Sequence, residues 1–144
     1  MKKTLAIAIP ALILTVSCQS AATKKALEGQ QLAEEAIAIH DEIMPQVSVF
    51  DKTGLHIDSL LNNMSAISAN DSGIDTASLR SDLVELKSNL EDATDFMMTW
   101  MYEYQPDSTD VDYQKSEVEK VKKMKKQFEE VAAESKSKLA PFNL

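Results

Sequence analysis

The sequence predicts an all-α fold, an antiparallel up-down-up three-helix bundle. The chain of 144 residues has only three glycines and no sustained run of alternating β-branched residues. Three long segments carry apolar residues in alternating steps of four and three, the spacing that places side chains on one face of a helix. Short turn-rich stretches at residues 69–74 and 105–108 join these segments. Such short connections force consecutive helices to pack as antiparallel neighbours.

The first expected helix covers residues 23–68 and is about 65–70 Å long at 1.5 Å per residue. Its apolar ridge continues without a slip across Pro45, and consists of Ala36, His40, Ile43, Val47, Phe50, Gly54, Ile57, Leu61 and Met64. Pro45 lacks an amide donor and its ring clashes with the carbonyl of Asp41, so we expect a kink there. The alternative is a genuine break within "VFDKTGL", residues 49–55, which would produce a four-helix bundle.

The second expected helix has a heptad seam typical of coiled coils. The seam consists of Leu79, Leu83, Leu86, Leu90, Ala93, Met97, Trp100 or Met101, and Tyr104. Asp75 or Thr76 can cap the start of this helix, and the helix ends before Pro106.

The third expected helix begins at "DSTD", residues 107–110, and its weaker stripe consists of Val118, Val121, Phe128, Ala132 and Leu139. Lys125 falls on this stripe. Either its stem lies along the apolar surface, or the stripe shifts towards Met124 and Val131. We expect the lysine-rich run at 120–126 to pair with acids of neighbouring helices.

The N-terminus has the pattern of a secretory signal: Lys2 and Lys3, then a short apolar run, then small residues. Cys18 follows in "LTVSC", which resembles the lipobox of bacterial lipoproteins, where the cysteine is lipidated. We therefore expect a signal peptide at 1–17, a lipid anchor and tether at 18–24 and a helical domain at 25–144. A leftover thiol in a plain signal peptide is the alternative for Cys18. Gln19 after the cysteine favours the outer membrane, with the domain facing the periplasm or the cell surface.

Charge restricts the possible partners. Without Lys2 and Lys3, the chain keeps 13 Lys and Arg against 23 Asp and Glu, a net charge of −10. Phosphates and anionic lipids repel so acidic a chain, so we expect no nucleic-acid partner and contact with the membrane through the lipid alone.

Antiparallel pairing gathers one cluster of unusual residues near the kink: His40, Met44, Met97, Met98, Trp100, Met101 and Tyr104. Tyr113 and the third tyrosine, Tyr102, are expected there too. In the structural interpretation the bulky side chains fill the space at the bend, and His40 hydrogen-bonds a tyrosine or a carboxylate. In the alternative, His40 and Met44, together with Met97, Met98 or Met101, supply imidazole and thioether ligands for cuprous copper or haem iron.

Catalytic patterns are missing from the sequence: it has no glycine-rich phosphate loop, zinc spacing or serine triad context. Asp41 and Glu42 adjoin His40, but neighbouring helical positions diverge by about 100° and cannot converge on one substrate atom. The sequence therefore predicts a protein that is not an enzyme, that needs no cofactor, and that acts by contact with other envelope proteins.

Two motifs, "HDEIMP" at 40–45 and "ATDFMMTWM" at 93–101, carry a family resemblance. Together they resemble a group of small helical lipoproteins of flavobacteria and their relatives, some of which are labelled "viral A-type inclusion protein". The similarity covers roughly residues 30–140. It implies a lipid-anchored helical domain of the cell envelope, and it implies no enzymatic activity.

Overall fold

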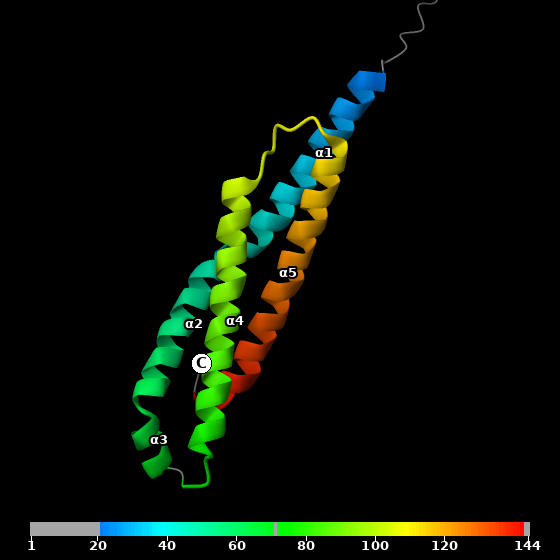
Figure 1. Cartoon of the computed structure of the whole chain (residues 1–144). Coiled ribbons are helices and arrows are strands. Elements are labelled where there is room, and N and C mark those ends of the chain that lie inside the picture. The colour runs from blue at the N-terminus through cyan, green and yellow to red at the C-terminus, as the bar shows by residue number, and fades with distance from the viewer. Residues whose placement is uncertain (1–20, 71, 143–144) are drawn as a thin grey trace, which may run out of the picture.

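The structure is a computed structural model that describes residues 21–70 and 72–142. Every regular element in this part of the chain is helical, which confirms the all-α fold (Figure 1). The elements are α1 (Ala21–Ile43), α2 (Pro45–Asn62), α3 (Met64–Asn70), α4 (Thr76–Glu103), α5 (Val111–Leu139) and the short 3₁₀ helix η1 (Ala140–Phe142). The expected signal peptide and Cys18 lie outside the described residues. Of the expected tether, residues 21–24 belong to α1.

The expected bend lies at Met44, directly before Pro45. Met44 keeps α-helical dihedral angles, φ −52° and ψ −38°. Its amide donates to the carbonyl of His40 at 2.8 Å, and its own carbonyl accepts from the amide of Val47 at 3.1 Å. The missing N–H of Pro45 therefore interrupts the α-helical ladder while the backbone stays helical.

The alternative break within residues 49–55 is wrong, because α2 runs through this stretch without interruption. The chain is divided at Met44 instead, and four long helices result: α1, α2, α4 and α5. A second irregular residue, Asn63, separates α2 from the short α3. Its side-chain amide donates to the carbonyl of Ser59 at 2.8 Å.

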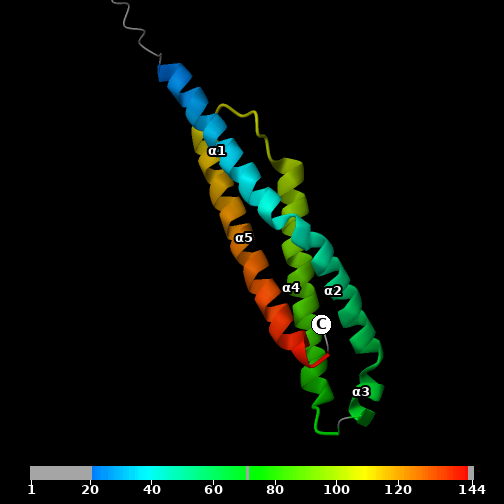
Figure 2. The ribbon, with the colours of Figure 1, turned by 180° about the vertical axis from the view of Figure 1, so that it is seen from behind.

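The helices on the two sides of the bend pack against different neighbours. α1 packs mainly along α5, whereas α2 packs mainly along α4, which in turn packs on α5 (Figures 1 and 2). α1 and α5 run in the same direction, and α4 runs opposite to both. The C-terminal end of α1 therefore contacts both α4, through His40 and Trp100, and α5, through Glu42 and Lys125.

Ion pairs join the parallel helices α1 and α5. Lys115 lies 3.0 Å from Glu28, Lys122 lies 2.9 Å from Glu35, and Lys125 lies 2.6 Å from Glu42. The acidic partners recur every seven residues, as the pairs flanking a coiled-coil seam do. The expected pairing of the lysine run with neighbouring acids is confirmed for Lys122 and Lys125. Lys120 and Lys126 pair within α5 instead.

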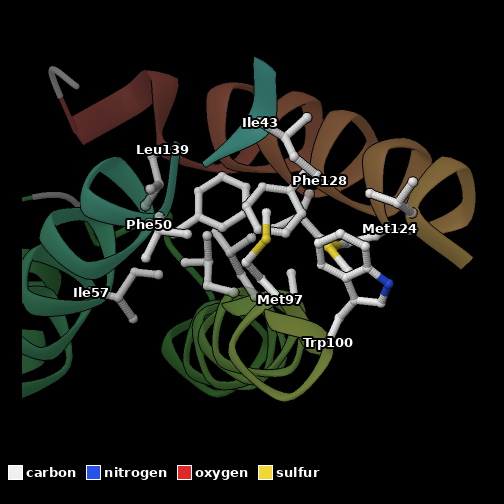
Figure 3. Packing of buried hydrophobic residues seen from close by; sticks show 14 of the residues in the cluster. Ile43, Phe50, Ile57, Met97, Trp100, Met124, Phe128 and Leu139 are labelled. Atoms are coloured by element: carbon white, nitrogen blue, oxygen red, sulfur yellow. The ribbon is translucent and has the colours of Figure 1, made fainter. Parts of the chain in front are cut away.

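The core follows the predicted ridges closely. On α4 the residues Leu83, Leu86, Leu90, Ala93, Met97 and Trp100 are all buried. On α5 the stripe shifts to Met124 and Val131, which are buried, and Lys125 points to Glu42 instead. The rings of Phe50 and Phe128 stack at 4.9 Å in the middle of the molecule (Figure 3). Burial of these apolar side chains supplies the main driving force for folding.

Aspartates begin the two long return helices. Asp75 accepts hydrogen bonds from the amides of Ala77 and Ser78 at the start of α4. Asp110 does the same for Asp112 and Tyr113 at the start of α5. These caps satisfy amides that have no partner within the first helical turn, which explains why both helices begin where they do.

Candidate functional site

Four aromatic rings stack in a row that leads from the end of α1, beside the bend, to the start of α5. His40 comes from the end of α1, Trp100 from the last turn of α4, Tyr104 from the position directly after α4, and Tyr113 from the start of α5. The ring centroids lie 5.6 Å apart between His40 and Trp100, 4.5 Å between Trp100 and Tyr104, and 6.4 Å between Tyr104 and Tyr113. The predicted meeting of His40 with Trp100 and Tyr104 is confirmed, as is the participation of Tyr113.

His40 is bonded at one ring nitrogen and unpartnered at the other. Its Nδ1 lies 2.9 Å from Oδ1 of Asp41, so the expected carboxylate partner is the adjacent residue. Its Nε2 is buried and has no hydrogen-bond partner among the described residues. In the tautomer that donates from Nδ1, this Nε2 keeps a free lone pair. Glu42 pairs with Lys125 and points away from the imidazole.

The methionines of the predicted cluster separate into two groups. Met97 is fully buried in the core, and Met44 packs against the core while partly exposed. Met98 and Met101 are 42% and 44% exposed, so they lie on the surface. Tyr102 lies at the same end of α4 but outside the row of rings: its side chain is 92% exposed, because two helical positions turn it about 200° away from the buried Trp100.

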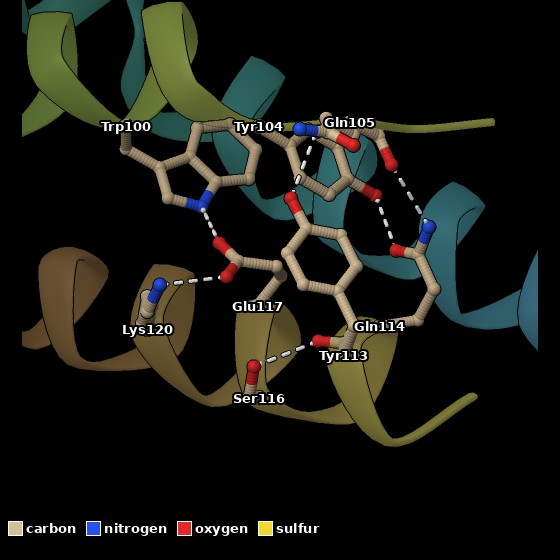
Figure 4. Close-up of polar contacts among 8 residues, drawn as sticks. All are labelled: Trp100, Tyr104, Gln105, Tyr113, Gln114, Ser116, Glu117 and Lys120. Carbon is tan, nitrogen blue, oxygen red and sulfur yellow. Dashed lines mark hydrogen bonds and ion pairs between the residues drawn. The ribbon is translucent and has the colours of Figure 1, made fainter. Parts of the chain in front are cut away.

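A buried polar network, which the sequence reasoning missed, connects these rings to α5 (Figure 4). Nε1 of Trp100 donates to Oε2 of Glu117 at 2.9 Å, and Lys120 bonds the other carboxylate oxygen at 2.6 Å. The side chain of Glu117 is only 4% exposed. Both polar contacts offset the cost of burying this carboxylate.

Gln114 holds the connection between α4 and α5. Its side chain is fully buried. Its Oε1 accepts from the hydroxyl of Tyr104 at 2.9 Å, and its Nε2 lies 3.1 Å from the carbonyl oxygens of Gln105, Pro106 and Ser108. Tyr113 adds a bond from the amide of Gln105 to its hydroxyl. The connection is therefore fixed to the start of α5 by side chains.

A signal for this network exists in the sequence. Gln114 and Glu117 lie four residues before Val118 and Val121, so the α5 stripe extended by one turn passes through both. Burial also changes the chemistry of Tyr104. It raises the pKa of the phenol to about 12, with further contributions from Tyr113 and the charge of Glu117.

The cluster mainly has a structural role, since it packs the ends of α1 and α4 against α5. Its carboxylate, amide and hydroxyl groups all have hydrogen-bond partners, so the Nε2 of His40, which has none among the described residues, is the polar atom of the cluster left available for a ligand. Within residues 21–70 and 72–142 no group of three or more His, Cys, Asp or Glu side chains could hold a metal ion. Any metal there would depend on methionine sulfur as well as on His40.

A groove lies between α2 and α4, away from the row of rings that begins at His40 and ends at Tyr113. Its volume is about 510 Å³. Its apolar lining includes Phe50, Gly54, Leu55 and Leu90, and its charged lining consists of Asp51, Asp58, Lys87, Glu91 and Asp95. Lys87 bonds Asp58 at 2.7 Å, and this contact raises the pKa of the Lys87 ammonium. The sequence reasoning did not anticipate this groove.

Comparisons with known proteins returned no relatives. No family model, no curated protein and no solved structure matches the chain. Among the helices of the described residues, none is both long and apolar enough to cross a membrane.

Proposed function

We propose that this chain is a lipid-anchored helical protein of the cell envelope that acts by protein–protein contact and has no catalytic activity. The anchor rests on Cys18 in its lipobox-like context and on the resemblance to small envelope lipoproteins. We assign it to the outer membrane, with the helices facing the periplasm or the cell surface. The partners are then other envelope proteins.

We further infer that α1, α2 and α3 behave as one bent rod, so that the body works as an up-down-up three-helix bundle. The helical dihedral angles of Met44 and the hydrogen bonds across it support this view. Rings that stack at the bend make such a rod stiff. A stiff rod holds its exposed side chains in fixed positions, which suits binding to another protein.

The observation that carries the proposal is an apolar face on α4 that no other element of the described residues covers. Met98, Met101 and Tyr102 follow one another at positions i, i+3 and i+4, and their exposed fractions are 42%, 44% and 92%. Residues with this spacing lie side by side on a helix. Large apolar side chains gathered on one surface are typical of protein contact sites, where methionine and tyrosine are enriched.

Photo-crosslinking tests this proposal. A photo-reactive amino acid replaces Tyr102 in the full chain, expressed in its native cells, and Glu119, which is 68% exposed, is replaced in the control. We expect discrete protein adducts from position 102 and none from position 119. Equal labelling at the two positions, or no adduct from either, contradicts a contact function for this face.

The lipid anchor has a separate test. Cells that express the full chain are labelled with radioactive palmitate, and the wild type is compared with Cys18→Ser. We expect label in the wild type only. Equal label in the two proteins rules out Cys18 as the acceptor.

A second candidate function, binding of cuprous copper or haem, is favoured by one observation at His40. Ligating histidines commonly donate the N–H of their second ring nitrogen to a carboxylate. Nδ1 of His40 contacts Asp41 in this way, and Nε2 has no hydrogen-bond partner in the described part of the chain. Met44 and Met101 are the candidate thioether ligands. The test is a titration of the full chain with Cu(I) and with haem, followed by absorbance, for wild type, His40→Ala and the control His56→Ala. Spectra that are unchanged at micromolar ligand end this candidate.

A further inference from the structure

The groove between α2 and α4 has a gap at Gly54, where the apolar ridge of α2 lacks a side chain. A Cβ placed on Gly54 would meet no atom within 4 Å. Gly29 in α1 has closer neighbours: a Cβ placed on it would lie 3.8 Å from the carbonyl oxygen of Ser108 and 4.0 Å from the side chain of Val111. Gly29 therefore lies against the α4–α5 connection, whereas close packing does not explain Gly54.

Glycine inside a helix is unfavourable relative to alanine, because it costs more backbone entropy. A glycine that faces open space in the middle of α2 therefore needs another reason. Its effect here is to leave the groove open beside Leu55, which is 70% exposed, and above the buried Phe50 and Leu90. A side chain from outside can enter this gap as a knob enters a hole in a coiled coil.

The charges around the gap are mainly negative. Asp58 and Glu91 share the one ammonium of Lys87, at 2.7 and 3.7 Å. Asp51 and Asp95, which line the same groove, have no basic partner among the described residues. Asp51 precedes Gly54 by three residues, which places its carboxylate about one helical turn, roughly 5 Å, along the axis from the gap.

We propose that this groove docks a basic amphipathic helix of a partner protein, with one aliphatic or aromatic side chain inserted over Gly54 and a lysine or arginine facing Asp51 and Asp95. The inference rests on the contact function proposed above and names the surface and the chemistry of the partner. The lining residues span about 12 Å of each helix, which matches two turns of a docked helix. A second copy of this chain fits less well, since it carries the same negative charge, −10 without Lys2 and Lys3.

The direct test uses two synthetic helices and the full chain with Cys18→Ser. One fluorescent peptide carries leucine on one face and lysine on the others, and the second has glutamate in place of lysine. Fluorescence anisotropy should show binding of the lysine peptide at micromolar concentration and none of the glutamate peptide. Equal binding of the two peptides, or no binding of either, overturns the proposal.

Matched variants locate the binding. Gly54→Leu fills the gap and should weaken binding at least tenfold, whereas Ser59→Leu adds the same side chain outside the groove and should change it less than twofold. Asp51→Asn combined with Asp95→Asn should weaken binding at least fivefold, and Asp92→Asn should not. Helical content measured by circular dichroism shows that each variant is folded. Gly54→Leu and Ser59→Leu with equal affinities contradict docking at the groove.

Photo-crosslinking in native cells separates this inference from the proposed function. Adducts to a basic protein from a photo-reactive amino acid in place of Leu55 support the groove. Adducts from position 102 but none from position 55 overturn the groove and leave the contact function standing. An adduct of twice the chain mass from position 55 assigns the groove to a second copy and overturns the basic partner.

Discussion

Two regions of the molecule are built in different ways: the middle of the core, and the ring cluster, which consists of His40, Trp100, Tyr104, Tyr113, Gln114 and Glu117. In the ring cluster, buried hydrogen bonds of Trp100, Gln114 and Glu117 accompany the stacked rings. In the middle, Phe50 and Phe128 stack within an apolar core. Hydrogen bonds need particular partners at particular distances, whereas apolar packing depends mainly on volume. The ring cluster thus fixes the geometry of the helices through specific contacts, whereas the middle is held by apolar packing.

Replacement of Trp100 by alanine should have the largest effect. We expect Trp100→Ala to lower the free energy of unfolding by about 3–5 kcal/mol, because it leaves a cavity. It also removes the donor to the buried carboxylate of Glu117. Chemical denaturation of the full chain measures the loss, and Phe128→Ala, with a similar loss in the middle, is the comparison. A near-neutral Trp100→Ala would place the indole on an exposed surface and contradict the packing described above.

Trp100→Phe sharpens the same comparison. It keeps an aromatic ring in the stack but removes the N–H that Glu117 accepts, so we expect a smaller loss of about 1–3 kcal/mol. An unchanged free energy of unfolding would show that this hydrogen bond does not stabilise the ring cluster.

Gln114→Ala should have the next largest effect, a loss of about 2–3 kcal/mol. The change removes the acceptor of the Tyr104 hydroxyl and the donor to three carbonyls of the α4–α5 connection. Hydrogen exchange should become faster in residues 104–110. Gln127→Ala on the same helix is the control, and an equal effect of the two changes would mean that the connection does not depend on Gln114.

Much of the fold could be predicted because helical periodicity reports burial directly. The seam of α4 and the bend before Pro45 follow from spacing and from the missing amide of proline. The network of Gln114 and Glu117 could not be predicted in this way, since a polar residue on an apolar stripe is compatible with either exposure or a buried partner. The partner depends on which helices meet, and the transfer of α1 to α5 at the bend is a tertiary effect.

The candidate site was predicted in part for the same reason. Register placed His40 near Trp100 and Tyr104, because antiparallel helices of known turn position bring fixed residue pairs together. The heptad seam placed Met97 on the buried face and left Met98 off it, but it did not decide between Trp100 and Met101, since steps of three and of four from Met97 both fit the pattern. The groove at Gly54 depends on a missing side chain, which periodicity treats as part of the ridge.

Pro45→Ala should change the free energy of unfolding by less than about 2 kcal/mol in either direction. The variant gains an amide that can donate to the carbonyl of Asp41, but a straighter helix would misfit the ring stack of His40 on Trp100. Thermal melts measure the balance. A large stabilisation would mean that the bend has no packing role.

Stability at high pH tests the burial of Tyr104. Because burial raises the pKa of its phenol to about 12, above the ordinary value of 10.0, the contribution of the neutral phenol is complete below pH 10. It is lost as the pH rises through about 12. Lysines such as Lys87 and Lys138, whose pKa values are raised by acidic partners, lose their contributions in the same direction.

Comparison with Tyr104→Phe isolates the tyrosine, since the lysine contributions are common to both proteins. We expect Tyr104→Phe to cost about 1 kcal/mol at neutral pH and to lose less stability than the wild type between pH 10 and 12. Parallel pH profiles for the two proteins would show that the phenol is not buried.

The central claim is that the helical register continues through the bend and brings His40 against Trp100. The most direct measurement is a nuclear Overhauser spectrum of the full chain, in which the single tryptophan and the two histidines make assignment simple. We expect cross-peaks between the imidazole of His40 and the indole of Trp100, lost in His40→Ala and kept in His56→Ala. Cross-peaks from the indole to other helices but none to His40 would contradict the claim.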